Sequence, residues 1–183
     1  ETIIHFLREL FSLLGDADIS VKITGSIGMG ISEKCSLPFV QEVVSATKAI
    51  QQGYPHVGSM IDIGGEDAKV VFFKDAEAID LRMNGNCAGG TGAFIDQMAV
   101  ILGVNVEELN RLALNATRVY PIASRCGVFC KTDIQNLVAR NVSREDIAAS
   151  IFHAVAVQTV ITLAHGYDIE TPVLFCGGPL TFI

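Results

Sequence analysis

The chain has 183 residues, of which 50% are hydrophobic, and this is enough for one good core or two small lobes that share an interface. Its net charge of -7 at pH 7 works against nucleic-acid binding, which needs clustered Lys and Arg, so we expect no nucleic-acid partner. No charged segment followed by an apolar stretch and a small-residue cleavage site opens the sequence, so we expect a cytoplasmic protein.

The first third of the sequence alternates helical and extended patterns. Apolar residues at helical spacing predict an amphipathic helix over residues 2–14. Residues 19–24 are typical of a short strand, and closely spaced glycines predict a flexible loop over residues 25–30. A second helix is expected over residues 36–53, with a proline in its first turn and a glycine at its end.

The periodicity changes from helical to alternating near residue 57. Three β-rich runs, residues 57–63, 68–73 and 78–83, are separated by turns rich in Gly, Asp, Glu and Lys, which predicts an antiparallel meander. We place a lobe boundary at this change. Residues 1–58 are then the remainder of a first lobe, and residues 59–183 form a second lobe.

Helices dominate the second half of the sequence. One is expected to end at Leu102, another to begin after Asn105, and a long one to open at Ser143. Residues 147–164 carry no formal charge and approach the length of about 20 residues that crosses a bilayer. Their interspersed polar residues and alanines favour a buried helix, so we expect no membrane partner. A final apolar strand is expected over residues 172–176.

The sharpest motif lies in residues 61–69, where an apolar strand ends in Asp62 and a tight double-glycine turn follows. Glycines let backbone N–H groups approach phosphate oxygens, and a nearby Asp can hold Mg²⁺ through water. A simple hairpin turn is the alternative for this motif taken alone. Lys69, which begins the next strand, is either a phosphate contact or a solvated strand residue.

A second double glycine follows the last predicted strand. Two strand-Gly-Gly units separated by a helical block suggest a nucleotide held between lobes. The pair resembles the second phosphate motif and the adenosine motif of the superfamily that contains actin, hexokinase and the heat-shock ATPases. The candidate nucleotide-binding residues are Gly64, Gly65, Glu66, Asp67, Gly177 and Gly178.

Two of the five cysteines lie just before predicted helices. The positive end of a helix dipole favours the thiolate form of Cys87 and of Cys126, and so their use as metal ligands. Taken alone, either one is more often a buried small hydrophobic residue than a ligand. Cys130 is expected to face the core, and Cys35 and Cys176 are interpreted as core or loop thiols.

Together these motifs resemble the BadF/BadG/BcrA/BcrD-type ATPases from about Ile23 onward, and most closely the activators of 2-hydroxyacyl-CoA dehydratases. The resemblance implies an α/β protein with the ribonuclease-H-like, actin-like ATPase fold and two lobes. It also implies that Cys87 and Cys126 each supply one thiolate to a 4Fe-4S cluster that two subunits share, since two thiolates cannot complete a shell of four. The implied cofactors are ATP or ADP, Mg²⁺ and one cluster per homodimer.

The implied function is an ATPase that drives a low-potential electron to an acyl-CoA dehydratase or reductase, with Asp62 as catalytic residue. The sequence has Glu66 where many relatives have Gln, and it lacks the first phosphate hairpin of the superfamily. We therefore expect a chain truncated at both ends that hydrolyses little ATP by itself. A small-molecule kinase of the same fold and a regulatory module without catalysis are the alternatives, and the kinase would not need Cys87 and Cys126.

Overall fold

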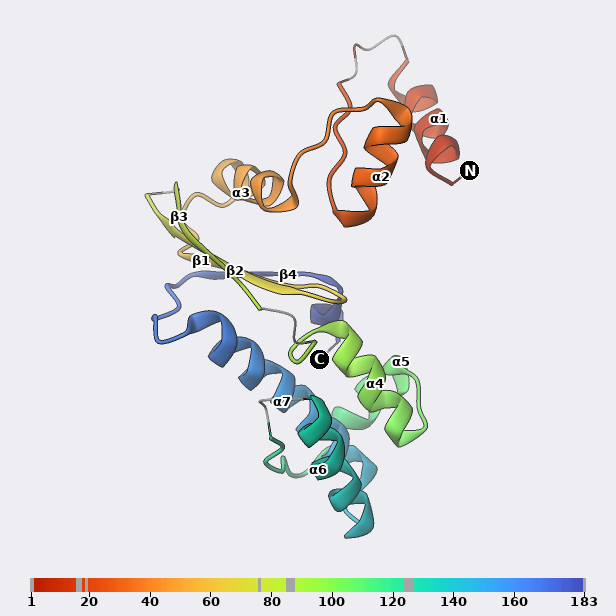
Figure 1. The fold of residues 1–183 in the computed structure, drawn as a ribbon, viewed down its shortest axis with the longest axis vertical. Coiled ribbons are helices and arrows are strands. Elements are labelled where there is room, and N and C mark those ends of the chain that lie inside the picture. Colours follow the sequence, from red (N-terminus) through yellow and green to blue (C-terminus); the bar gives the residue numbers. More distant parts are fainter. Residues whose placement is uncertain are drawn as a thin grey trace. The chain divides into compact units, whose positions relative to one another are not determined.

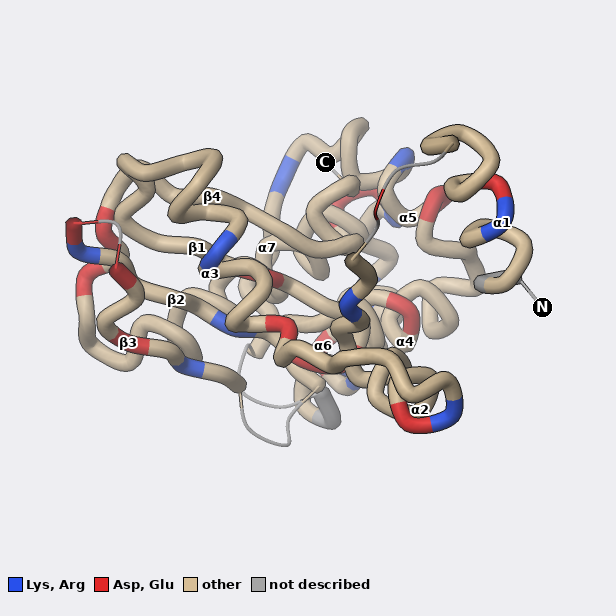
Figure 2. Tube along the Cα trace, turned by 90° about the horizontal axis from the view of Figure 1, so that it is seen from above, with Lys and Arg blue, Asp and Glu red and all other residues tan. Residues whose placement is uncertain are grey.

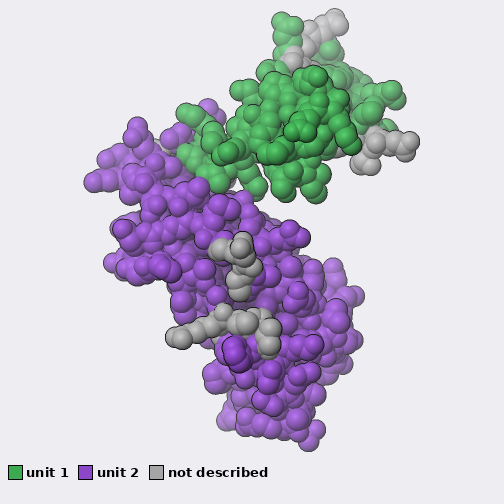
Figure 3. Space-filling view, in the orientation of Figure 1, with its two compact units in different colours: residues 1–49 green, residues 50–183 purple. Residues whose placement is uncertain are grey.

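The computed structural model describes residues 2–15, 18, 20–75, 77–84, 88–123 and 127–182. The chain separates into two compact units, residues 1–49 and 50–183, which are coloured separately in Figure 3. This division falls inside a helix, earlier in the chain than the lobe boundary that the sequence suggests after residue 58. The assignment of residues to lobes of an actin-like ATPase stays a prediction.

Unit 1 contains α1 (Thr2–Leu14), α2 (Ser26–Cys35) and most of α3 (Glu42–Gly53). The predicted bounds of the first helix are confirmed. The strand expected over residues 19–24 is, in its described part, a single parallel bridge between Ile23 and Phe39.

The flexible loop expected over residues 25–30 is wrong, because this segment forms the first turns of α2. The glycine at position 28 serves close packing: a Cβ there would lie 2.6 Å from Cγ2 of Ile23. The helix expected from Ser36 also begins later, at Glu42. Ser36 instead ends α2 in the left-handed conformation, with φ of 53°, and the chain then extends so that the Pro38 carbonyl accepts a hydrogen bond from the Ile23 amide.

Unit 2 is built on a four-stranded mixed sheet in the order β3-β2-β1-β4 (Figure 1). The antiparallel meander predicted from the sequence is confirmed, since β1 pairs with β2 and β2 with β3 in antiparallel fashion. The last strand returns after the helical block and pairs with β1 in parallel, the arrangement of an α/β fold. The strands are β1 (Ser59–Ile63), β2 (Ala68–Lys74), β3 (Glu77–Met83) and β4 (Val173–Cys176).

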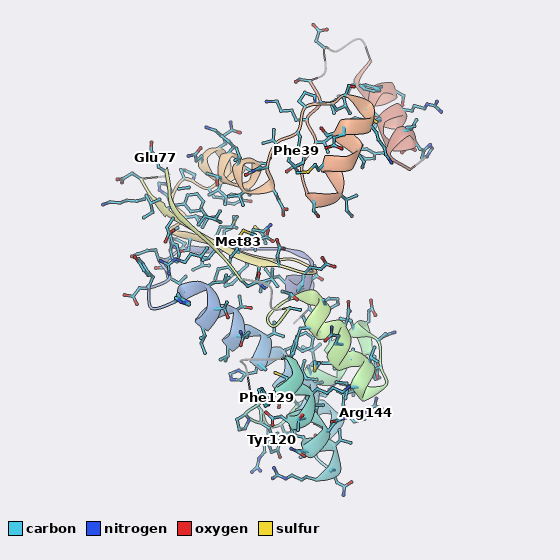
Figure 4. The ribbon with its side chains drawn as sticks, in the orientation of Figure 1. Phe39, Glu77, Met83, Tyr120, Phe129 and Arg144 are labelled. Atoms are coloured by element: carbon cyan, nitrogen blue, oxygen red, sulfur yellow. The ribbon has the colours of Figure 1, made fainter. Side chains whose placement is uncertain are left out.

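The helices of unit 2 enclose a core centred on α7, which contacts β2, α4, α5 and α6. The side chains of Asn105 and Ser143 cap α5 and α7 as the sequence predicts, accepting hydrogen bonds from the amides of Glu108 (2.8 Å) and Asp146 (3.2 Å). Arg144, the first residue of α7 (labelled in Figure 4), donates a hydrogen bond from its guanidinium to the carbonyl of Leu102, the last residue of α4 (2.7 Å). The helical elements are α4 (Gly92–Leu102), α5 (Val106–Ala113), α6 (Gly127–Ala139), α7 (Arg144–Ala164) and the 3-10 turn η1 (Gly178–Thr181).

By length and composition, α7 is the one helix in the described part of the chain that could cross a membrane. Its packing is that of a core helix. Ile147 and Ile151 are buried among the other helices, while Leu163 packs with Ile61 and Phe72 under the sheet. Basic and acidic positions are interspersed along the trace of unit 2 (Figure 2).

Candidate nucleotide-binding site

The turn between β1 and β2 is closed by a hydrogen bond from the Gly64 amide to the Asp67 carbonyl (2.8 Å). A Cβ on Gly64 would lie 2.6 Å from Oδ1 of Asp67, so the side chain of Asp67 occupies the space that any larger residue would need. The flanking strands stay in register, with Asp62 opposite Lys69. The geometry is therefore that of a hairpin turn, and its surroundings decide whether it can also serve a ligand.

The N-terminus of α4 docks on this turn. The first amides of a helix lack partners within the helix, and here Gly92 and Ala93 donate to the carbonyls of Gly64 (3.0 Å) and Gly65 (2.7 Å). A Cβ at position 92 would lie 3.2 Å from Cγ of Pro179 and 3.3 Å from Cα of Gly65. Three segments that are far apart in the sequence thus meet at one point.

The second double glycine lies against the end of β1. Gly177 has φ of 106°, and a Cβ there would lie 2.0 Å from the Ile63 carbonyl oxygen and 2.9 Å from Oδ1 of Asp62. The parallel register places Cys176 beside Asp62. Both strand-Gly-Gly units therefore end at the carboxyl ends of neighbouring parallel strands, where open α/β sheets bind ligands.

A cavity of about 630 Å³ opens beside these glycines. Its volume lies in the range of about 300–1,000 Å³ that small-molecule sites occupy. Of the predicted nucleotide-binding residues, it is lined by Gly65, Glu66 and Gly178. The other predicted nucleotide-binding residues, Gly64, Asp67 and Gly177, do not line the cavity, and neither does the predicted catalytic residue Asp62.

Residues that the sequence analysis missed complete the cavity. Carboxylates come from Asp96 on α4 and Glu107 on α5, and Val106 and Phe182 contribute apolar surface. The helix starts themselves were predictable, but which of their residues face the turn depends on how α4 docks. Together with Glu66 the lining holds three carboxylates, and among the described lining residues there is no lysine or arginine.

Asp62, the predicted catalytic residue, forms an ion pair behind the turn. The Nζ atom of Lys69 lies 3.5 Å from Oδ2 of Asp62 and 3.5 Å from Oδ2 of Asp67. The side chain of Lys69 is only 4% exposed, so its interpretation as a solvated strand residue is wrong. It also does not line the cavity.

Comparison with known proteins identifies the family. A model of the BadF/BadG/BcrA/BcrD ATPase family matches residues 12–181. The chain belongs to this family. It is 38% identical over 125 residues to the (R)-2-hydroxyglutaryl-CoA dehydratase activating ATPase of Acidaminococcus fermentans, covering 68% of this chain and 48% of that protein. It is 31% identical over 176 residues to the 2-hydroxyisocaproyl-CoA dehydratase activator of Clostridioides difficile, covering 94% of this chain and 65% of that protein.

Solved structures confirm the predicted actin-like ATPase fold of this family member. The activator of the 2-hydroxyisocaproyl-CoA dehydratase from Clostridium difficile with bound ADPNP matches with a TM-score of 0.81 and 31% identity, covering 96% of this chain and 66% of that one. Component A of the Acidaminococcus fermentans (R)-2-hydroxyglutaryl-CoA dehydratase matches with a TM-score of 0.77 and 32% identity, covering 86% and 60%. The chain spans from about half to about two thirds of the length of these relatives.

Two candidate ligands of this ATPase-family chain, Cys87 and Cys126, lie outside the described residues. The helices that follow them are described. Soon after Cys87, the Gly90 carbonyl accepts a hydrogen bond from Oγ1 of the buried Thr159 on α7 (3.2 Å). The helix that begins right after Cys126, α6, contacts both α4 and α7. The helices that follow the two cysteines in the sequence, α4 and α6, thus belong to one helical core.

Of the described cysteines, Cys130 is the core thiol that the sequence predicts, whereas Cys35, the last residue of α2, is neither a core nor a loop thiol. Cys130 is buried in the helical core, as predicted, and its thiol donates to the Ala123 carbonyl. Burial raises the pKa of the Cys176 thiol, and the neighbouring Asp62 carboxylate raises it further, which keeps this thiol protonated at neutral pH. Cys35 is exposed. Within the part of the chain described, no group of three or more His, Cys, Asp or Glu residues is placed to hold a metal ion.

Proposed function

We propose that this chain forms the nucleotide-binding part of an ATP-dependent activator. Hydrolysis would drive a low-potential electron from a 4Fe-4S cluster, shared by two copies of the protein, to a 2-hydroxyacyl-CoA dehydratase or a related CoA-ester reductase. The observation that carries the proposal is the convergence of both double-glycine units and the start of α4 on one cavity. The names of the relatives support the choice of partner.

ATP fits the chemistry of the cavity lining. Gly65 and Gly178 leave the backbone open to phosphate oxygens, and the apolar surface of Val106 and Phe182 suits a base. Asp96 and Glu107 offer acceptors for ribose hydroxyl groups. Because the described lining carries carboxylates and no cationic side chain, a polyphosphate should bind more tightly together with a divalent cation, and Mg²⁺ is the usual one.

Asp62 would act through Mg²⁺ rather than by direct contact with the nucleotide, because its side chain is 16% exposed and does not line the cavity. A carboxylate in that place can hold a metal-bound water, and phosphoryl transfer in such sites depends chiefly on positioning and electrostatics. Glu66, which does line the cavity, adds a negative charge that the cation must offset.

The cluster would be held by Cys87 and Cys126 from each of two copies, since four thiolates complete its shell. When bound, it supplies the one-electron chemistry. In the sequence, Cys87 and Cys126 precede α4 and α6, two helices of one core, and this supports their assignment as ligands. A reducing cytoplasm would keep these thiols available as ligands.

One spectrum tests the proposal against a kinase of the same fold. The intact protein is purified and reconstituted with iron and sulfide without oxygen, and its visible absorbance and iron content are measured. We expect a coloured protein with one cluster per two chains and ATP hydrolysis. A protein that binds ATP but stays colourless and iron-free would instead be a kinase or a regulatory module.

A further inference from the structure

Lys69 is a buried cation at the back of the nucleotide cavity. Its whole residue is 3% exposed, although lysine is almost never fully buried without a charged partner. A buried ammonium carries a large desolvation cost unless nearby carboxylates compensate it. Among the described residues, two carboxylates lie within 4 Å of it: that of Asp62, near the end of β1, and that of Asp67, which ends the turn.

The ammonium therefore links the two ends of the turn. Oδ1 of Asp67 lies 2.6 Å from where a Cβ of Gly64 would be, so this side chain packs directly against the first glycine. Asp62 in turn lies beside Gly177, the first glycine of the second double glycine. Lys69 thus contacts two aspartates that each lie against one of the two double glycines, although Lys69 itself does not line the cavity.

The charges of the described residues around the turn are mostly negative. The described lining of the cavity contributes three carboxylates, and the two aspartates behind the turn add two more. Removing the ammonium would leave the aspartate charges uncompensated, and their repulsion of an incoming triphosphate acts over several ångströms in a partly buried site. A bound Mg²⁺ would mask most of that repulsion.

We infer that Lys69 is a positioning residue of the nucleotide site, which holds Asp62 and Asp67 in place and offsets their charge so that nucleotide can bind. The inference rests on the proposed function, because it takes the ligand to be a nucleoside triphosphate. It assigns this buried lysine a role in the Mg²⁺ dependence of binding, which a residue that only stabilises the hairpin would not have.

The test compares the affinity for ADPNP, with excess Mg²⁺ and with EDTA, in the intact wild-type protein and in Lys69→Met. We expect Lys69→Met to weaken binding in EDTA about tenfold more than binding with Mg²⁺, because the metal screens the uncompensated carboxylates. Lys69→Arg, which keeps the charge, should restore most of the EDTA affinity. Lys74→Met, at the exposed end of the same strand, is the matched control and should change neither affinity.

A second variant does not depend on Lys69→Met folding. Asp67→Asn, at a side chain that is 45% exposed, removes one negative charge and should strengthen binding in EDTA relative to binding with Mg²⁺. Equal changes with and without Mg²⁺ in Lys69→Met and Asp67→Asn would overturn the inference and leave Lys69 a purely structural residue. A wild-type protein that binds no ADPNP under either condition would overturn the proposed function itself, and this inference with it.

Discussion

Gly177 lies so close to Ile63 that no side chain fits between them: a Cβ at position 177 would lie 2.0 Å from the Ile63 carbonyl oxygen. The backbone φ of 106° at Gly177 is also one that residues with a side chain rarely adopt. We expect Gly177→Ala to lower the free energy of unfolding by about 2–4 kcal/mol, because strain and steric overlap add. Urea unfolding of the purified variant measures this loss.

Gly178→Ala is the matched control, because no heavy atom lies within 4 Å of its Cβ position. We expect it to stay within about 0.5 kcal/mol of wild type. If both variants unfold at the wild-type urea concentration, β4 does not pack on β1 as described.

The carboxylates of the cavity predict a strong dependence of nucleotide binding on divalent cations. In Glu66→Gln the lining loses one negative charge, so ATP should bind several-fold more tightly in EDTA and respond less to added Mg²⁺. Titration calorimetry at several Mg²⁺ concentrations measures both effects. Glu77→Gln, at the exposed start of β3 (Figure 4), should behave as wild type. An unchanged Mg²⁺ response in Glu66→Gln would place the phosphates elsewhere.

The hydrogen bonds of Asp146 lead to a prediction of how the free energy of unfolding decreases in acid. Amides of Arg118 (2.9 Å) and Thr117 (2.8 Å) donate to its carboxylate, and these hydrogen bonds lower its pKa below the ordinary value of 3.8. Because the folded-state pKa is depressed, the stabilisation is fully present above about pH 3.8 and is lost as the pH falls through the lower folded value. Asp146→Asn should therefore be less stable than wild type at pH 7 and should lose less stability between pH 5 and pH 3.

Urea unfolding at the two pH values checks this, with Glu145→Gln in the same helical turn as control. If Asp146→Asn and wild type lose equal stability in acid, then groups other than Asp146 govern the acid transition.

The cysteine assignment predicts the iron content of variants. Cys87→Ser and Cys126→Ser in the intact protein should each lose bound iron and electron transfer, because serine is a poor substitute for a thiolate ligand. Cys35→Ser should keep both, since Cys35 is an exposed thiol of unit 1. Colorimetric iron analysis after anaerobic reconstitution gives the answer. Full iron content in Cys87→Ser would show that this residue is no ligand.

The sequence predicts a segment's structure well when the residues that contact the segment lie close to it in the sequence. The meander and the capped helices followed from periodicity and from Asn105 and Ser143, whose caps involve residues a few positions away. The closely spaced glycines of residues 25–30 predict flexibility, and this prediction is wrong because Gly28 has another role. In the structure it permits close contact with Ile23, and only the fold shows which side of a glycine is crowded.

Some residues of the candidate site could also be predicted from the sequence, and others could not. Gly65 and Gly178 could be found because double glycines after apolar strands form a recognisable pattern. Asp96 and Glu107 could not, since exposed acidic residues on helices are common and only the docking of the helices brings these two to the cavity. The burial of Lys69 was equally hidden, because it follows from the pairing of β2 with β1.

The hydrogen bonds from Gly92 and Ala93 to the carbonyls of Gly64 and Gly65 couple the position of α4 to that of the turn beside the candidate site. A helix of 11 residues is about 16 Å long and bends little, so a shift of the turn tilts the whole rod. Met98 and Leu102, farther along it, are buried in the helical core, and a tilt of the rod must therefore displace their neighbours. The segment that follows Cys87 leads into α4, so a displacement of the turn would be transmitted to residues 88–91 at the start of this helix.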